Sequence, residues 1–281
     1  MSETRLEPDT RPIAVGRTAE IYAWGADRVV KLYRAGSSRE YVAREARVSR
    51  VVHAAGLPAP AIYDADGEDG LIEIDGRFGI LYERFDGPTM LRDLAGRPWM
   101  AVSHAKALAA LHAQIHGVTA ASLPDLRSRI ERAIEVVEPS LPGEVVAAAR
   151  RDLADLPEGR RVCHGDFHPD NVLLGDVGFV LVDWGPASAG PPAADVAWTT
   201  LLFRFAGSPV GSPLPVRLAV RWLKAFCLRV YLRTYSELTG ITRAEIDRWI
   251  GVIAILRLRD GIPHERKALL RLIRRRFAQD G

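Results

Sequence analysis

The chain has 281 residues, of which 48% are hydrophobic and 26% charged, and its formal net charge is +3. This length and composition are typical of a globular protein with one large domain or two smaller ones. No stretch approaches the ~18 consecutive apolar residues of a membrane span, the N-terminal residues lack the apolar core of a signal peptide, and two cysteines are too few for a disulfide framework. We therefore expect a cytoplasmic protein with no membrane partner and no nucleic acid partner, while the oligomeric state is left open.

The N-terminal third of the sequence predicts short strands around one helix. Residues 12–34 contain two β-rich runs joined by a Gly-Ala-Asp turn, which is a hairpin pattern. Residues 37–56 predict a helix that begins at one of two serines and ends at Gly56. Residues 57–87 alternate β-rich runs with Asp-Gly turns, which indicates further antiparallel strands, and a Gly-Pro pair then breaks the pattern.

The rest of the sequence predicts mainly helices. One helix is expected in 99–116, and two more in 126–155 are separated by prolines. After a short strand at 178–185, the remaining helices are expected at 193–206, 214–260 and 262–277. The organisation is therefore α+β, with a small β-rich N-terminal domain at 1–86 and a larger helical domain at 87–281.

One segment carries an unusual density of polar side chains. The stretch "VCHGDFHPDNVLL", residues 162–174, places Asp166 and Asn171 five positions apart, and Asp183 follows twelve positions later at the end of a strand. An amide oxygen and a carboxylate, here Asn171 and Asp183, suit a hard divalent cation bound to phosphate. Asp166 can orient an acceptor hydroxyl and take its proton. These residue types are thus suited to phosphoryl transfer.

A second pair is predicted from the cost of burying a charge. In the helix expected at 37–56, Tyr41, Val48 and Val52 form an apolar stripe, and Glu45 falls on that stripe. A buried carboxylate is costly unless it is paired. Lys31, in the preceding apolar strand, is the evident partner, so we expect a Lys31–Glu45 ion pair.

The segment "HGDFHPDN" resembles the catalytic loop of protein-kinase-like enzymes, in the form found in the aminoglycoside phosphotransferase and choline kinase family. The later segment "DWGPASAGPPAADVAW" is similar to the metal-binding segment of the same family. The resemblance covers roughly residues 13–200. It implies a two-lobe protein-kinase-like fold, with a nucleotide-binding N-terminal lobe at 1–86 and a helical lobe at 87–281 that holds the catalytic loop and the acceptor site.

The resemblance implies a role for each matching residue. Asp166 would be the catalytic base, and Asn171 and Asp183 would bind Mg²⁺. His164 and Asp195 would brace the catalytic loop without reacting. The residues that would bind ATP, with GTP equally compatible, are Lys31, Glu45, Thr18, Glu83 and Phe85, of which Glu83 and Phe85 belong to the connector that holds the base through its backbone.

Two departures from the family pattern affect these expectations. The loop "VGRTAEIY" has the single glycine Gly16, which differs from the glycine-rich loop of protein kinases but not from small-molecule kinases of this type. Gly185 stands where many relatives carry a second carboxylate, which puts a second metal ion in doubt.

The sequence favours an ATP-dependent kinase whose acceptor is a hydroxyl of a small molecule, such as an antibiotic, a sugar or an amino alcohol. The alternative is a catalytically silent nucleotide-binding protein of the same fold. Residues 217–281 contain 15 lysines and arginines against 6 acidic residues, so we expect an acceptor that is neutral, weakly charged or anionic, covered by the loop at 206–215. The opposing interpretation is an acidic pocket that contains Asp260 and Glu265.

Overall fold

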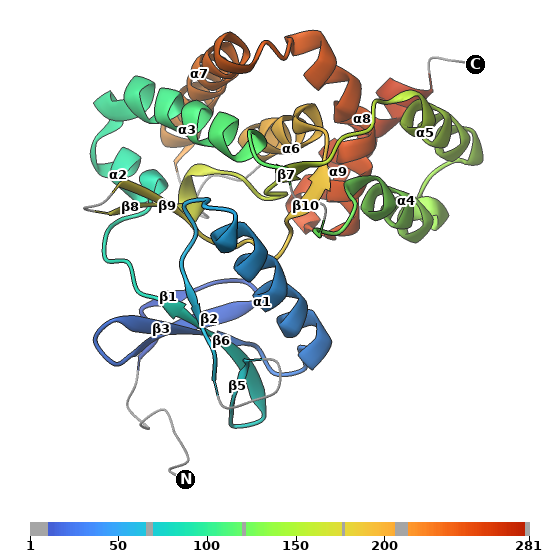
Figure 1. Cartoon of the computed structure of the whole chain (residues 1–281). Coiled ribbons are helices and arrows are strands. Elements are labelled where there is room, and N and C mark those ends of the chain that lie inside the picture. The colour runs from blue at the N-terminus through green and yellow to red at the C-terminus, as the bar shows by residue number, and fades with distance from the viewer. Residues whose placement is uncertain (1–10, 66–69, 120–121, 176–177, 206–212, 279–281) are drawn as a thin grey trace. The chain divides into compact units, whose positions relative to one another are not determined.

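The computed structural model describes residues 11–65, 70–119, 122–175, 178–205 and 213–278 (Figure 1). The chain divides into two compact units, one formed by the chain up to Met90 together with Asp170–Pro186, and the other by Leu91–Pro169 together with the chain from Ala187 onward. The division that the sequence predicts after residue 86 lies near the first boundary between the two units, which follows Met90. The sequence-based division places 170–186 in the helical part, whereas these residues belong to the first unit. Within the described residues, no helix combines the length and the apolar character needed to cross a membrane.

The first unit is built on an antiparallel sheet with the strand order β1-β2-β3-β6-β4, to which β5 adds by pairing with β6. Its strands are β1 (Ala14–Val15), β2 (Ala19–Trp24), β3 (Arg28–Tyr33), β4 (Ile62–Tyr63), β5 (Ile72–Ile74) and β6 (Arg77–Glu83). The hairpin predicted in 12–34 is confirmed: β2 and β3 pair around Gly25, whose φ of 70° favours glycine.

Helix α1 (Arg39–Ala54) packs against this sheet (Figure 1). Ser38 begins the helix, as predicted, because its Oγ accepts a hydrogen bond from the backbone N–H of Tyr41 at 3.2 Å. Val48 is buried on the packed face, whereas Tyr41 is 48% exposed, so the buried apolar face begins at Val42 and not at Tyr41.

A second hairpin completes the first unit. Strands β8 (Val172–Gly175) and β9 (Gly178–Leu181) pair antiparallel, with Val172 opposite Leu181. The connector after β6 lies against this hairpin, because the N–H of Leu174 donates to the carbonyl of Pro88 at 3.0 Å. Gly87 permits the approach: its φ is 152°, and a Cβ there would lie 2.2 Å from the carbonyl oxygen of Leu174.

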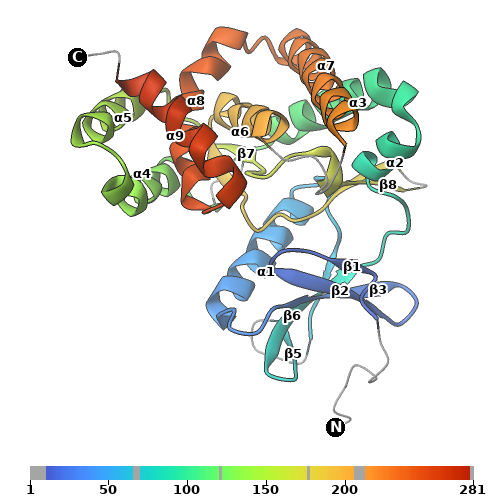
Figure 2. The same cartoon turned by 180° about the vertical axis from the view of Figure 1, so that it is seen from behind.

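The second unit is mainly helical (Figure 2). Its helices are α2 (Met90–Gly96), α3 (Ala101–His116), α4 (Leu126–Val137), α5 (Gly143–Asp155), α6 (Pro192–Phe205), α7 (Leu214–Thr239), α8 (Arg243–Arg259) and α9 (Pro263–Phe277), with short 3₁₀ turns at η1 (Pro98–Met100) and η2 (Glu138–Ser140). A third such turn, η3 (Pro169–Asn171), lies where the chain passes from the second unit back to the first. Helix α3 packs along α7, while α8 packs against α4, α6 and α9.

A two-stranded pair, β7 (Arg161–Cys163) with β10 (Ser188–Gly190), lies among these helices. Strand β7 leads directly into the segment that begins at His164, and β10 leads into α6. Both strands contact neighbouring helices, β7 packing on α3 and α6 and β10 on α4. The residues at the start of the polar segment are therefore anchored on several sides before the chain leaves the core.

Candidate functional site

The first unit brings together three of the predicted site residues. The Nζ of Lys31, on β3, lies 2.6 Å from Oε1 of Glu45 on α1 and 2.7 Å from Oδ1 of Asp183. The side chains of Lys31 and Glu45 are 12% and 4% exposed, while that of Asp183 is 41% exposed. The predicted Lys31–Glu45 pair is therefore present in this unit, and Asp183 joins it from the chain that follows β9.

The electrostatics of this cluster favour a charged lysine. Burial alone would lower the pKa of Lys31, but Glu45 and Asp183 hold it well above its usual value. Glu45 has a further neighbour in Tyr82, whose hydroxyl donates to Oε1 at 3.4 Å. Lys31 is thus a cation held in place by the carboxylate of Glu45. Its other carboxylate neighbour, Asp183, is exposed to solvent.

The β8–β9 hairpin explains how Asn171 and Asp183 come to be neighbours despite twelve positions between them. The N–H of Val182 donates to the carbonyl of Asn171 at 2.9 Å, which extends the ladder by one rung beyond Val172 and Leu181. Asp183 follows immediately, with a φ of 63°, a left-handed conformation that is rare for a residue with a side chain. Such local strain is concentrated at functional sites.

Gly185 occupies a position that has no room for a side chain. A Cβ at Gly185 would lie 2.3 Å from Oε2 of Glu45. The position expected to carry a second carboxylate in many relatives is thus filled by the carboxylate of Glu45, which already serves Lys31.

The second unit holds the other predicted residues. Asp195, at the start of α6, accepts hydrogen bonds from the backbone N–H of His164 at 2.6 Å and of Gly165 at 2.9 Å. Nδ1 of His164 in turn accepts from the N–H of Asp166 at 3.2 Å. Gly165 has a φ of 76°, which reverses the chain between His164 and Asp166. His164 and Asp195 are both buried.

The carboxylate of Asp166 is partly exposed and ionised. Its Oδ1 lies 3.4 Å from the indole Nε1 of Trp198, and its Oδ2 lies 3.5 Å from Nε2 of His168. Burial would raise the pKa of Asp166, but the interaction with His168, helped by His164 and Trp198, lowers it to about 2. Asp166 is therefore an anion at neutral pH that can accept a proton.

The remaining predicted residues lie at strand ends and in connections of the first unit. Thr18 is exposed in the turn between β1 and β2, where Arg34 ties the turn by donating to the carbonyls of Arg17 and Gly16, both at 3.0 Å. Glu83 ends β6, and its Oε2 accepts from the N–H of Ala61 at 3.2 Å. Phe85 is half-buried in the connector that follows.

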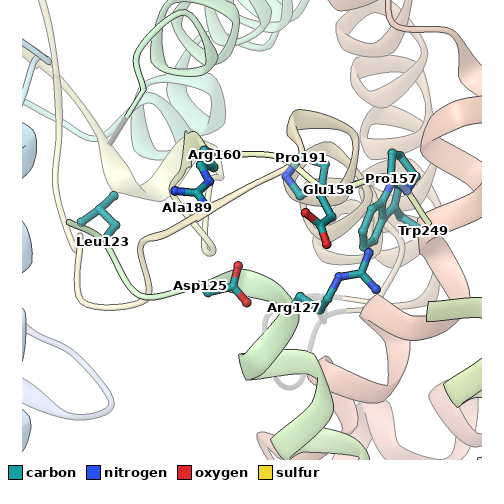
Figure 3. Close-up of a pocket in the computed structure, with 10 residues that line it drawn as sticks. Leu123, Asp125, Arg127, Pro157, Glu158, Arg160, Ala189, Pro191 and Trp249 are labelled. Atoms are coloured by element: carbon teal, nitrogen blue, oxygen red, sulfur yellow. The ribbon is translucent and has the colours of Figure 1, made fainter. Parts of the chain in front are cut away.

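The second unit contains a cavity of about 500 Å³ (Figure 3). Two of its polar side chains stabilise neighbouring elements: Asp125 caps α4 by accepting from the N–H of Ser128 at 2.7 Å, and Arg127 donates to the carbonyls of Leu153 and Leu156. None of the predicted site residues lines this cavity.

A second cavity, of about 550 Å³, gathers arginines between α6, α7 and the start of α8. The arginines that line it are Arg204, Arg221, Arg229, Arg233 and Arg243. Four of these five arginines come from the arginine-rich part of the sequence, residues 217–281.

Asp260 and Glu265, the two residues of the alternative acidic-pocket interpretation, both lie beside Arg257. Glu265 is buried and accepts two hydrogen bonds from Arg257, at 2.8 and 2.9 Å. Asp260 lies 3.4 Å from the same guanidinium. Burial would lower the pKa of Arg257, but Glu265, Asp260 and, more weakly, Asp166 raise it. The charge of Arg257 is therefore neutralised by Glu265 and Asp260, and Arg257 interacts only weakly with Asp166.

Some polar residues of the second unit escaped the sequence analysis. His112 and His116 on α3, and Tyr231 and Tyr235 on α7, are all buried and linked to Asp195. The only sequence signal is their spacing of four, which places each pair on one helix face. Cys163 is also buried, and burial raises the pKa of its thiol well above the usual value.

A small antiparallel sheet with one helix, and a mainly helical unit with the "HGD" segment, define an α+β protein-kinase-like fold. Solved structures with this fold include aminoglycoside phosphotransferase APH(4)-Ia in ternary complex with AMP-PNP and hygromycin B, which shares 18% identity and a TM-score of 0.63 over 96% of this chain and 92% of that one. An amicoumacin kinase in complex with AMP-PNP, Ca²⁺ and Ami shares 13% identity and a TM-score of 0.63, over 97% and 89% of the two chains.

A choline/ethanolamine kinase family protein from Mesorhizobium loti is also similar, with 17% identity and a TM-score of 0.58 over 96% of this chain and 86% of that one. Comparison with curated protein sequences gave no match. Residues 9–240 match the model of the phosphotransferase enzyme family. The chain therefore belongs to the phosphotransferase enzyme family, and the resemblance drawn from its motifs is confirmed.

Proposed function

We propose that this phosphotransferase moves the γ-phosphoryl group of ATP to a hydroxyl of a small molecule. The observation that carries the proposal is the buried Lys31–Glu45 pair with Asp183 beside it. A strand lysine held by a helix glutamate is the arrangement that positions nucleotide phosphates in kinase-like folds. A purely structural ion pair would not need a third, half-exposed carboxylate in a left-handed conformation.

In this proposal, Lys31 binds the nucleotide phosphates and Glu45 holds its ammonium group in place. The turn that contains Thr18 contributes backbone and hydroxyl donors to the phosphates. Glu83 and Phe85 belong to the connector that receives the base through backbone hydrogen bonds. The complexes of APH(4)-Ia and of the amicoumacin kinase with AMP-PNP support the choice of nucleotide.

Asn171 and Asp183 fit Mg²⁺ by the chemistry of their donors, because both offer hard oxygen atoms and the hairpin holds them side by side. Two protein ligands suit this ion, which keeps several waters and binds substrate phosphates for the rest of its coordination. When bound, the ion would neutralise charge on the phosphate groups. Because the site has one carboxylate ligand and one amide ligand, and Gly185 adds no further carboxylate, it favours a single tightly held ion.

Asp166 acts as the base that orients the acceptor hydroxyl and takes its proton. Its pKa of about 2 keeps it ionised before the acceptor binds. The brace formed by Asp195 and His164 fixes the backbone on which Asp166 stands. These two residues hold the loop and take no part in the proton transfer.

We propose an acceptor that is neutral, weakly charged or anionic. The support is that Glu265 is already neutralised by Arg257, so it does not offer a free carboxylate to a polycation. The expected covering loop at 206–215 falls largely outside the described residues, since 206–212 are not described and α7 begins at Leu214. The relatives crystallised with hygromycin B, streptomycin or Ami show that one fold serves chemically different antibiotics.

The test is a coupled assay of ADP release over a panel of aminoglycosides, other antibiotics, sugars and amino alcohols, each at low and high salt. We expect turnover with a neutral or weakly charged hydroxyl compound, and a loss of roughly 10²–10⁴ in kcat for Asp166→Asn with nucleotide affinity retained. Nucleotide binding without turnover on any acceptor would favour the catalytically silent alternative. Efficient use of polycations, with affinity that falls steeply as salt rises, would refute the proposed acceptor class.

A further inference from the structure

Five buried side chains from three helices form a connected polar network in the second unit. His112 and His116 lie one turn apart on α3, Tyr231 and Tyr235 lie one turn apart on α7, and Asp195 lies in the first turn of α6. Helices α3 and α7 run side by side (Figures 1 and 2). Buried polar groups are costly unless every one of them is hydrogen-bonded, so the partners of each atom matter.

The contacts repeat in two parallel chains that converge on one atom. Nδ1 of His112 lies 2.5 Å from the hydroxyl of Tyr231, and its Nε2 lies 3.0 Å from Oδ2 of Asp195. Nδ1 of His116 lies 2.6 Å from the hydroxyl of Tyr235, and its Nε2 lies 3.3 Å from the same Oδ2. Each tyrosine is therefore linked to Asp195 through one imidazole.

Counting protons assigns a direction to every hydrogen bond. Burial would raise the pKa of Asp195, but the hydrogen bonds from His112 and His116 keep it well below its usual value, so it is an acceptor only. Both histidines must then donate through Nε2–H. Burial, with His116 beside it, lowers the pKa of His112 to about 3, so this ring is neutral and its Nδ1 is an acceptor. The hydroxyl of Tyr231 is the matching donor, and the parallel geometry of Tyr235 and His116 leads us to infer the same direction there.

The same carboxylate also holds the loop that carries Asp166. It accepts the backbone N–H groups of His164 and Gly165, and Phe167 stacks on the ring of His112 with centroids 3.9 Å apart and an interplanar angle of 23°. The histidines thus touch the loop twice, once through Asp195 and once through Phe167.

A metal ion is the competing explanation. His112, His116 and Asp195 offer ligand atoms that lie within 4.8 Å of one another. A metal would require the bare Nε2 lone pairs, however, whereas the geometry uses both Nε2 atoms as proton donors to an oxygen. The donors and acceptors of the network are matched with one another without a metal ion.

We propose that His112 and His116 are positioning residues that hold the catalytic loop through Asp195, and that Tyr231 and Tyr235 lock each imidazole in the Nε2–H tautomer. The effect on turnover rests on the proposed function, whereas the effect on the loop does not. Helix α7 thereby becomes part of the device that orients Asp166. The network explains why two tyrosines of α7 are buried with their hydroxyls against α3.

The test compares His116→Leu, His116→Gln and Tyr235→Phe with the native chain. Leucine removes the donor, glutamine can supply an N–H near the position of Nε2, and phenylalanine removes only the tautomer lock. His104 provides the matched control, because it is a buried histidine of the same helix that bonds to a different carboxylate, Asp93, at 2.6 Å. His104→Leu and His104→Gln repeat the same chemical changes away from Asp195.

Two measurements are needed, and the first is independent of any acceptor. Hydrogen–deuterium exchange of peptides covering 162–168 should be at least about tenfold faster in His116→Leu and clearly faster in Tyr235→Phe, but not in the His104 variants. Nitrogen-15 NMR of the native chain should show the Nε2–H tautomer for both histidines, and Tyr235→Phe should weaken that preference at His116 only.

The second measurement is steady-state kinetics. We expect kcat to fall by about 10- to 100-fold in His116→Leu, with little change in nucleotide affinity and substantial recovery in His116→Gln. Unchanged loop exchange in His116→Leu, or the Nδ1–H tautomer in the native chain, would overturn the proposal, as would stoichiometric zinc that is lost with His116. If the leucine variant does not fold, His116→Gln and Tyr235→Phe still decide. A native chain without turnover would remove the proposed function and leave the exchange result standing.

Discussion

Replacing either member of the Lys31–Glu45 pair should have unequal effects on stability. Lys31→Met removes the cation and leaves the carboxylate of Glu45, which is 4% exposed, buried as a charge. Glu45→Gln removes a charge but keeps an oxygen acceptor, and Lys31 retains Asp183 at 2.7 Å. The lysine substitution therefore strands a buried ion, whereas the glutamate substitution does not.

The magnitudes follow from this difference. Breaking a buried pair by removing one partner costs about 3–5 kcal/mol, whereas exchanging an ionic acceptor for a neutral one costs about 1–2 kcal/mol. With a shift of about 2–4 °C per kcal/mol for a chain of this size, Lys31→Met should lower Tm by about 6–20 °C and Glu45→Gln by about 2–8 °C. The double variant Lys31→Met/Glu45→Gln contains no stranded ion, so it should be more stable than Lys31→Met alone.

Urea unfolding and differential scanning calorimetry of the three variants and the native chain would measure these effects. The Arg50→Gln variant is a suitable control, because it breaks the exposed Arg50–Asp64 pair, also at 2.6 Å, where a loss below about 1 kcal/mol is expected. Glu45→Gln proving the more damaging single change, or a double variant no more stable than Lys31→Met, would refute the reasoning that Lys31 neutralises a buried Glu45.

Three further predictions concern Asp183, Asp166 and Gly185. Asp183→Ala should weaken Mg²⁺-dependent nucleotide binding at least about tenfold (1.4 kcal/mol) and excess Mg²⁺ should partly restore it; calorimetric titration identical to the native chain would exclude a metal role. Because the pKa of Asp166 is lowered to about 2, its carboxylate should stay ionised as pH falls from 7 to about 4 and protonate only below that range, which a carbon-13 NMR titration would show against Asp166→Asn. Gly185→Ala puts a methyl group 2.3 Å from Oε2 of Glu45 and should cost about 1–3 kcal/mol in urea unfolding, with relief in a Glu45→Ala background; equal cost in both backgrounds would contradict the close contact.

Local patterns predicted most of the elements but not their long-range pairing. The hairpin around Gly25, the cap at Ser38 and the α+β order all follow from residues close in sequence. The hydrogen bond between Leu174 of β8 and Pro88 of the connector after β6 joins segments far apart in the chain, and no local pattern encodes it. For the same reason the sequence placed 170–186 with the helical part, although it packs with the first unit.

The site residues also divide into those that local patterns predict and those that depend on long-range packing. Lys31 and Glu45 were predictable because a carboxylate on a buried helix face needs a cation nearby. The link between His112 and Tyr231 was not, because these residues are 119 positions apart and both look like ordinary members of helix faces. A polar network becomes visible only when the packing of α3 on α7 is known.

The discontinuous first unit has a consequence for the order in which the chain can fold during synthesis. Lys31 and Glu45 leave the ribosome early, but Asp183 and the hairpin that presents it belong to Asp170–Pro186. Domains commonly fold from the N-terminus as they emerge. The first unit cannot be completed until the whole intervening stretch of 91–169 has been translated. Until then the nascent sheet must persist, or be shielded, without the hairpin that presents Asp183.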